Sequence, residues 1–192
     1  MSALKAGDAF PSDVSFLYVK PTPETSDVLA CGIPTKFDAS AGMNLHPISL
    51  PTTYLRDQLA NHVSTTTEFA NKKAVLVSVP GAFTPTCQVT HVTGYINKLK
   101  ELKAKGVDTI VVIAFNDPFV QAAWGKANGI KDESIIFATD NEAAFSKTLG
   151  WTLGPRTARY AIVVDHGKVV YAEKEPAGDV GVSGVDAVLA VL

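Results

Sequence analysis

The strongest constraint on the fold of this chain is a series of short apolar runs that alternate with helical patterns after residue 73. Such runs are typical of strands buried on both faces of a sheet, which helices connect in α/β proteins. We expect strands at 74–79, 107–115, 134–138, 160–164 and 169–172, and helices at 87–105, 118–128, 142–149 and 183–192. This order predicts an α/β fold with a mixed central sheet and helices on both faces, compatible with a thioredoxin-like architecture.

Turn and capping residues mark the ends of several of these elements. Asn116-Asp117 is expected to open the helix at 118–128 and Gly129 to close it, and Gly150 is expected to close the helix at 142–149. Asp165-His166-Gly167-Lys168 separates two apolar runs and predicts a β-hairpin. Ser183 is expected to cap the last helix.

The first third of the chain, to about residue 67, is less regular and is rich in proline. A short strand is expected at 16–19, and the apolar spacing over 53–63 permits a short helix. The full length of 192 residues suits one domain with a real core, covering 1–192.

Composition excludes several classes of function. The net charge of -2 gives no basic patch, so nucleic acid is not an expected partner. No apolar run is long enough to span a membrane, and the first residues lack a signal-peptide or transit pattern. The last residues are not Ser-Lys-Leu. We therefore expect a cytoplasmic protein, with peroxisomal or mitochondrial placement left open.

The chain has two cysteines, Cys31 and Cys87, which are too few for a disulfide scaffold at this length. They are either buried inert thiols or redox groups. No Cys-x-x-Cys is present, and the histidines are scattered, at His46, His62, His91 and His166. We therefore expect no metal site.

Cys87 occupies the most informative local position. Thr84 is a suitable N-cap and Pro85 suits the first helical position, so Cys87 should fall in the first helical turn. Free backbone N–H groups and the positive end of the helix dipole would surround its sulfur. Both favour the thiolate, which is the reactive form of cysteine.

The sequence Pro80-Gly81-Ala82-Phe83-Thr84-Pro85-Thr86-Cys87 resembles the active-site motif of the peroxiredoxins, Pro-x-x-x-Thr-x-x-Cys. With Gln88 to Tyr95 after it, the motif is similar to the peroxiredoxin-5-like subfamily and, within it, to the fungal alkyl hydroperoxide reductase (thioredoxin peroxidase) branch. The resemblance extends to the C-terminus through Asp117-Pro118-Phe119, Ala123-Trp124-Gly125-Lys126 and Gly150-Trp151. It also covers Ala30-Cys31-Gly32-Ile33-Pro34.

The resemblance implies a thiol-dependent peroxidase that reduces hydrogen peroxide and alkyl hydroperoxides without a cofactor. Cys87 would be the peroxidatic nucleophile, which becomes sulfenic acid. Thr84 would hydrogen-bond the thiolate and the peroxide, and Pro80 would shield the sulfur from water. The family also supplies an arginine before the hairpin, for which Arg159 is favoured over Arg156.

The resemblance further implies that Cys31 resolves the sulfenic acid of the other subunit of a homodimer. An intersubunit Cys31–Cys87 disulfide would then be reduced by thioredoxin or a similar dithiol protein. A one-cysteine mechanism, recycled by glutathione or glutaredoxin, is the alternative. The stretch at about 41–66 is longer than in the family members that the chain resembles, so we expect an extended loop or insertion there.

Two other functions can be written for these residues. His91 lies four positions after Cys87, on the same helix face, and a Cys87–His91 pair could act as a hydrolase. We favour a packing or hydrogen-bonding histidine, because a peroxide requires no general base on an acyl intermediate. A non-enzymatic holdase on a thioredoxin-like fold is the remaining alternative.

Overall fold

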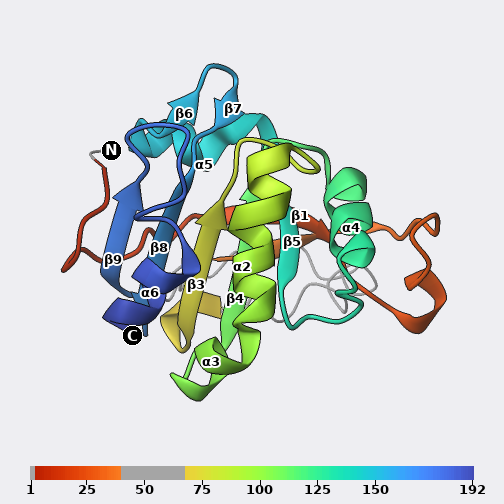
Figure 1. Ribbon diagram of the computed structural model, residues 1–192, viewed down its shortest axis with the longest axis horizontal. Helices are drawn as coiled ribbons and strands as arrows, with labels where there is room; N and C mark the ends of the chain where they lie inside the picture. Colours follow the sequence, from red (N-terminus) through yellow and green to blue (C-terminus); the bar gives the residue numbers. More distant parts are fainter. Residues whose placement is uncertain (1–2, 40–67) are drawn as a thin grey trace, which may run out of the picture.

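A seven-stranded mixed sheet runs through the computed structural model, which describes residues 3–39 and 68–192 (Figure 1). The strands lie in the order β2-β1-β5-β4-β3-β8-β9, and β3, β4 and β5 are parallel to one another. The other neighbours are antiparallel. The strands are β1 (Ser15–Val19), β2 (Pro34–Asp38), β3 (Lys73–Ser78), β4 (Thr109–Ala114), β5 (Ile136–Thr139), β8 (Tyr160–Asp165) and β9 (Lys168–Lys174).

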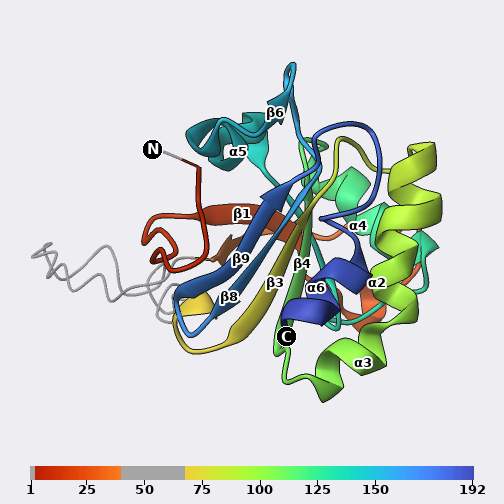
Figure 2. The same ribbon diagram turned by 60° about the vertical axis from the view of Figure 1, so that its left-hand side comes forward.

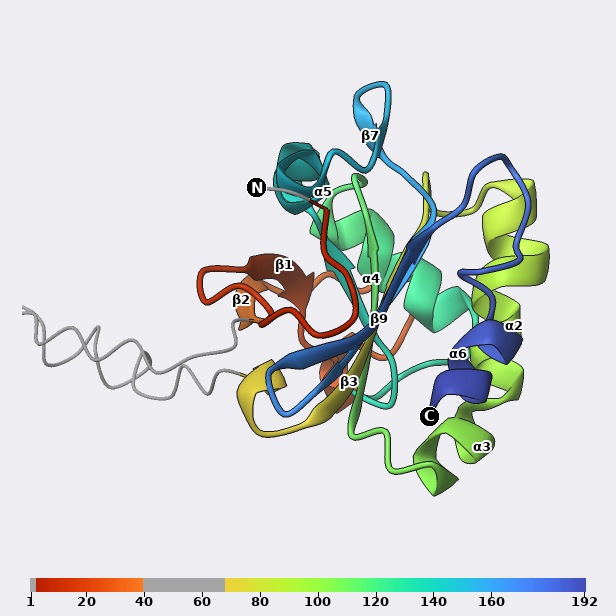
Figure 3. The same ribbon diagram turned by 90° about the vertical axis from the view of Figure 1, so that its left-hand side faces the viewer.

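Helices cover both faces of this sheet, as predicted. Figure 3 shows α2 (Thr93–Asn97), α3 (Leu99–Ala104) and α6 (Val185–Val191) on one side, with α5 (Ala144–Leu149) on the other. The sheet is apolar on both sides because side chains alternate along each strand. In β3, Val75 and Val77 join the core cluster under α2 and α6, whereas Ala74 and Leu76 join the opposite cluster.

α4 (Pro118–Ala127) packs on β5 and β1. Trp124 of this helix is fully buried and belongs to the core cluster that also contains Cys87. Short β6 (Thr152–Leu153) and β7 (Arg156–Thr157) form a separate two-stranded sheet next to α5, above the main sheet (Figure 2). The arrangement confirms the predicted α/β class and thioredoxin-like architecture.

The segment expected as one helix over 87–105 is helical but divided. A π-helix spans Cys87–Val92, α2 follows, and α3 begins only after Lys98, whose φ of -101° and ψ of 16° interrupt the helix. The hydroxyl of Thr93 donates to the backbone carbonyl of Gln88, within the π-helix, at 2.5 Å. π-helical turns occur frequently at functional sites.

Most of the predicted end signals are confirmed. Asp117 caps α4, since its carboxylate accepts the amides of Phe119 and Val120 at 2.9 and 3.0 Å. Gly129 and Gly150 adopt φ values of +78° and +69° after their helices. The hairpin turn has φ of +47° at His166 and +81° at Gly167, so two left-handed residues connect β8 to β9.

Two end signals act differently from the prediction. Asn116 does not cap α4; its Oδ1 accepts the amide of Ala82, in the turn after the neighbouring strand β3, at 2.8 Å. Ser183 does not cap α6, which begins after Gly184. The Ser183 hydroxyl instead donates to the Glu175 carboxylate at 2.7 Å.

The short strand expected at 16–19 is confirmed as β1. The helix expected over 53–63 and the extended loop at 41–66 lie outside the described residues. Among the residues that the structure does describe, no helix combines the length and apolar character needed to cross a bilayer.

Candidate active site

The Pro80–Cys87 turn leaves the carboxyl end of β3 and is fixed to the neighbouring β4. The amide of Val79 donates to the Ile113 carbonyl at 3.0 Å, and the amide of Ala82 donates to Asn116 at 2.8 Å. Phe83 adopts a φ of +58°, a conformation that is unusual for a non-glycine residue. These contacts determine where the chain enters its next helix.

Cys87 is 1% exposed and lies at the beginning of the π-helix. Helical backbone begins at Pro85, so Thr84 occupies the N-cap position, and its carbonyl accepts the Gln88 amide at 2.8 Å. The Thr84 hydroxyl donates to the Gly81 carbonyl at 3.0 Å, which closes the turn rather than capping the helix. The lone pairs of this hydroxyl remain available to accept a hydrogen bond.

Strand pairing carries Arg159 to the same place. β8 runs antiparallel to β3 with Ser78 opposite Tyr160, so the residue before β8 lies beside the end of β3. Two side chains fasten this junction. The Ser78 hydroxyl donates to the Ala158 carbonyl at 2.8 Å, and the Thr157 hydroxyl donates to the Val79 carbonyl at 2.6 Å.

The four residues predicted around the reactive thiol line one open pocket with a volume of about 520 Å³, namely Pro80, Thr84, Cys87 and Arg159. Arg156, the second candidate, lines it too but is only half-buried, whereas Arg159 is 7% exposed. The structure therefore brings the predicted set together across 80 residues of sequence.

His91 supports the arginine. A guanidinium nitrogen of Arg159 lies 3.1 Å from Nδ1 of His91, and Nε2 of His91 lies 2.8 Å from the Ser183 carbonyl. Because a carbonyl only accepts, Nε2 carries the proton, and Nδ1 accepts from Arg159. Burial, and to a smaller extent the Arg159 charge, lower the pKa of His91 to about 4, although the Ser183 hydrogen bond opposes this shift.

Both ring nitrogens of His91 are thus engaged away from Cys87. The hydrogen-bonding role favoured from the sequence agrees with this geometry, and a hydrolase base at His91 does not. A neutral imidazole is the form that can accept from a guanidinium, so the environment of His91 suits its contact with Arg159.

Glu175 fixes the segment that carries Ser183, the residue that His91 contacts. One carboxylate oxygen accepts the amides of Gly181 and Ser183 and the Ser183 hydroxyl, each at 2.7 Å. Burial raises the pKa of Glu175, but these hydrogen bonds outweigh burial and leave the pKa below its ordinary value. The backbone amide of Glu175 also donates to the Arg159 carbonyl at 2.9 Å.

The comparisons with known proteins agree with this site. The Redoxin family matches residues 5–189. Peroxiredoxin AHP1 of Chaetomium thermophilum is 48% identical over 193 residues, which cover 100% of this chain and 96% of the relative. A putative peroxisomal peroxiredoxin of Lipomyces kononenkoae is 45% identical over 191 residues, covering 96% and 99%.

The chain is a peroxiredoxin.

A solved structure is also similar to this peroxiredoxin. Reduced Prx3 of Vibrio vulnificus, in complex with hydrogen peroxide, has a TM-score of 0.69 and 32% identity, covering 97% of this chain and 98% of that one. The similarities agree with the fungal branch named from the motif. The protein is therefore a thiol peroxidase, whose substrate is a peroxide and whose electrons come from a thiol reductant.

In this peroxiredoxin the second cysteine lies away from the pocket. Cys31 is exposed and precedes β2, with its sulfur 3.9 Å from the Leu29 carbonyl. The segment that carries it, drawn in orange, lies beyond α4 in Figure 1, whereas Cys87 lies at the start of the helices that lead into α2. Both cysteines are free thiols. Cys31 therefore does not meet Cys87 of the same chain.

A polar cluster that the sequence did not reveal joins the Cys87 helix to α4. Gln88 accepts from the Trp124 indole through Oε1 and donates to Asn128 at 2.6 Å through its amide. Asn128 donates back to Gln88 at 3.1 Å. No spacing in the sequence signals such contacts between separate helices. Within residues 3–39 and 68–192, no group of three or more His, Cys, Asp or Glu could hold a metal ion.

Proposed function

We propose that Cys87 is the peroxidatic nucleophile of this peroxiredoxin and that Arg159 is its cationic partner. The observation that carries the assignment is the buried guanidinium in the pocket of Cys87. Arg159 has no carboxylate within ion-pair distance among the described residues, and its Nε lacks a hydrogen-bond partner there. A buried cation without a carboxylate is costly unless an anion completes the site, and a thiolate at Cys87 is such an anion.

The first half-reaction follows from these positions. The Cys87 thiolate attacks one peroxide oxygen, the O–O bond breaks, and the electron pair leaves with the second oxygen as alkoxide or hydroxide. The guanidinium stabilises negative charge as it moves from sulfur to the leaving oxygen. A proton then yields an alcohol or water, and Cys87 becomes sulfenic acid.

Thr84 and Pro80 would position the peroxide. The Thr84 hydroxyl donates its hydrogen bond to the Gly81 carbonyl, so its lone pairs can accept a hydrogen bond from the peroxide O–H. This hydrogen bond would orient the other peroxide oxygen toward the Cys87 sulfur. Pro80 lines the pocket with a ring that has no N–H, which favours an apolar wall against water.

For the second half-reaction, we propose that Cys31 of one subunit resolves the sulfenic acid of another. The exposure of Cys31 and its position away from the pocket support a reaction between chains in a homodimer. Thioredoxin or a similar dithiol protein would then reduce the Cys31–Cys87 disulfide. A one-cysteine cycle with glutathione or glutaredoxin is the competing mechanism.

Stopped-flow mixing of the reduced protein with hydrogen peroxide or an alkyl hydroperoxide tests the first half-reaction. We expect Cys87 to be oxidised far faster than free cysteine at the same pH, and the Cys87→Ser variant to lose this reaction. A rate equal to that of free cysteine would refute the assignment and leave a holdase role on this fold.

Non-reducing electrophoresis after a peroxide pulse tests the second half-reaction. Wild type should form a covalent dimer, and thioredoxin should reduce its disulfide and return the monomer. Cys31→Ser should remain monomeric on the gel. A covalent dimer in the Cys31→Ser variant would remove the resolving role from Cys31.

We also propose a cytoplasmic location. The relative named peroxisomal provides the alternative, which imaging of a fluorescent fusion at the N-terminus would reveal as punctate rather than diffuse signal.

A further inference from the structure

Lys126 directs a buried ammonium at the segment that carries Cys31. The residue is 7% exposed, and its Nζ donates to the Ala30 carbonyl at 2.7 Å. Lysine is rarely buried to this extent without a partner. In the described parts of the chain no carboxylate lies within ion-pair distance of Lys126, so the Ala30 carbonyl is the group that compensates its burial.

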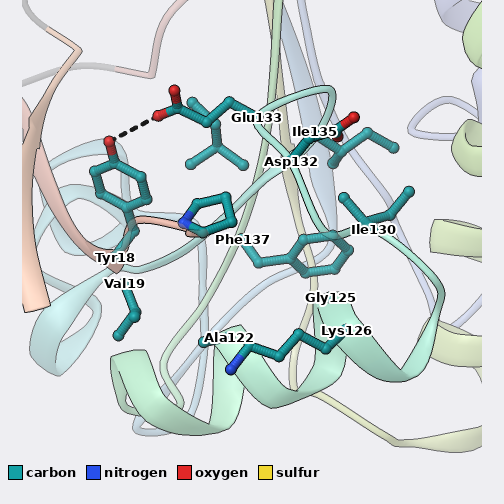
Figure 4. A pocket seen from close by; sticks show the side chains of 12 residues that line it. Tyr18, Val19, Ala122, Gly125, Lys126, Ile130, Asp132, Glu133, Ile135 and Phe137 are labelled. Atoms are coloured by element: carbon teal, nitrogen blue, oxygen red, sulfur yellow. Dashed lines mark hydrogen bonds between the residues drawn. The ribbon is translucent and has the colours of Figure 1, made fainter. Parts of the chain in front are cut away.

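The surroundings of Lys126 explain why its ammonium donates to the Ala30 carbonyl and not to a carboxylate. Figure 4 shows its side chain lying along α4 below the Phe137 ring. Glu133 lines the same small pocket, but its carboxylate points toward Tyr18, whose hydroxyl donates to it at 3.0 Å. Glu133 also pairs with Lys20 at 3.5 Å. Asp132, the other acid that lines the pocket, accepts the Ser134 amide at 2.9 Å. Both acids therefore have partners other than Lys126.

A second contact fixes the chain on the other side of Cys31. A Cβ atom added to Gly32 would lie 2.6 Å from Cγ1 of Val19, a distance that real Cβ atoms do not tolerate. Val19 is buried in β1 and is β-branched, so it cannot readily turn aside. The backbone at Gly32 thus lies directly against the sheet.

The segment before these two contacts is also ordered by its own hydrogen bonds. Thr22 and Thr25 form a capping box around a short helical turn at Pro23–Thr25. The Asp27 carboxylate accepts the amide of Leu29 at 2.8 Å, and its carbonyl accepts the amide of Ala30 at 3.1 Å. The chain therefore reaches Ala30 in a defined direction.

Cys31 stands between the two contacts and faces solvent. Its neighbours Leu29 and Ile33 are 88% and 85% exposed, so the thiol sits among apolar side chains that the molecule leaves uncovered. From this arrangement we infer that Lys126 is a positioning residue for the resolving step. Its ammonium holds the Ala30 carbonyl and, with Gly32 against Val19, presents Cys31 to the sulfenic acid of a second copy of the chain.

The inference rests on the proposed role of Cys31 and concerns one chemical step. The Cys31 sulfur attacks the sulfur of a Cys87 sulfenic acid, forms the S–S bond and expels hydroxide, which takes up the Cys31 proton as water. A thiol held in a reactive position meets its target more often than one on a loose segment. Lys126 should therefore affect disulfide formation and not the reaction of Cys87 with peroxide.

The test is a single-turnover experiment on Lys126→Met, which keeps the unbranched side chain up to the ε position but removes the ammonium. Rapid quenching with a thiol-blocking reagent and non-reducing electrophoresis give the rate of covalent dimer formation. We expect that rate to fall about tenfold, a loss typical of misplaced reacting groups. The stopped-flow rate of Cys87 oxidation should stay at the wild-type value. Sulfinic acid at Cys87, measured by mass spectrometry, should rise because the sulfenic acid persists.

Gly32→Ala provides a second variant that does not depend on Lys126. The added Cβ should displace the segment and slow dimer formation, and Val19→Ala in the same chain should restore it by removing Cγ1. Lys131→Met is the matched control, since it removes an exposed charge close by in sequence and should leave both rates unchanged.

A wild-type rate of dimer formation in Lys126→Met would overturn the role of Lys126, as would equal slowing of oxidation and dimer formation in that variant. A wild-type rate in Gly32→Ala would overturn the role of the contact between Gly32 and Val19. Cys31→Ser separates this failure from that of the proposed function. If Cys31→Ser still forms the covalent dimer, the resolving role itself is wrong. If Cys31→Ser abolishes the dimer while Lys126→Met leaves its rate intact, only the role of Lys126 is wrong.

Discussion

The two thiols of this peroxiredoxin sit in opposite kinds of environment. Cys87 is buried, and the walls of its pocket come from the turn after β3 and from the start of β8, which side-chain hydrogen bonds fasten together. Cys31 is exposed on a segment that Lys126 and Val19 hold at two points. The first thiol is placed by the sheet, and the second is placed by a helix side chain and one close backbone contact.

The difference agrees with the half-reactions proposed for the two thiols. Attack on a peroxide requires a fixed cation and the exclusion of water, which a buried pocket provides. Attack on a sulfenic acid of another chain requires reach, which a buried thiol cannot have. Changes around Cys87 should therefore act on oxidation, and changes around Cys31 on recycling.

The largest expected effect comes from Arg159. Arg159→Met removes the cation that faces the developing charge, and we expect the rate of Cys87 oxidation to fall by about 10²–10³-fold. Arg159→Lys keeps the charge but loses the planar fork and should recover only part of the rate. Stopped-flow fluorescence with hydrogen peroxide measures both.

Arg156→Met is the matched control, because Arg156 lines the same pocket but is less buried. Its rate should stay close to that of wild type. A larger loss in Arg156→Met than in Arg159→Met would reverse the assignment of the two arginines.

The next effect concerns pH and His91. Its pKa falls from 6.5 in the unfolded chain to about 4 in the folded one, mainly through burial. Between these values the unfolded chain binds the proton and the folded chain does not. The stability that His91 contributes is therefore full above pH 6.5 and is lost as the pH falls toward 4, by about 3 kcal/mol.

His91→Gln should flatten this part of the profile, since the amide can accept from Arg159 and donate to Ser183 without titrating. Urea unfolding of both proteins at several pH values gives the difference. Parallel profiles for wild type and His91→Gln would show that His91 is not the group responsible.

The smallest of the three effects is that of the Thr84 hydroxyl. Thr84→Val keeps the shape of the side chain but removes the acceptor for the peroxide, so oxidation should slow about tenfold, or about 1.4 kcal/mol. Thr84→Ser should retain most of the rate. Equal rates in Thr84→Val and wild type would leave the hydroxyl with only its structural bond to Gly81.

The sequence predicted the order of strands and helices well because the evidence for it is local. Continuous apolar runs marked β3, β4 and β8, and the glycines at 129 and 150 marked helix ends that require left-handed backbone. The pocket residues were named from the resemblance to the peroxiredoxins, and the structure shows why they come together. Arg159 precedes a strand that pairs with β3, and the Cys87 turn follows β3, so both reach the same edge of the sheet.

What the sequence did not reveal depends on contacts between distant residues. His91 and Arg159 are 68 positions apart, and Ser183 is 92 positions from His91, so no periodicity connects them. Ser183 looked like a cap because serine caps helices generally, but the nearby Glu175 carboxylate takes its hydroxyl. The break at Lys98 was hidden because the apolar spacing continues through it.

The pairing of β3 with β8 has a consequence for the newly made chain. During synthesis, Cys87 leaves the ribosome well before residue 160. Arg159 can line the pocket of Cys87 only after β8 has paired with β3, where Tyr160 lies opposite Ser78 and Asp165 opposite Lys73. Domains acquire such distant pairings late, because the loop between the partners must first be closed. A half-synthesised chain therefore lacks the arginine that we propose as the partner of Cys87, and the pocket is complete only when the whole fold has formed.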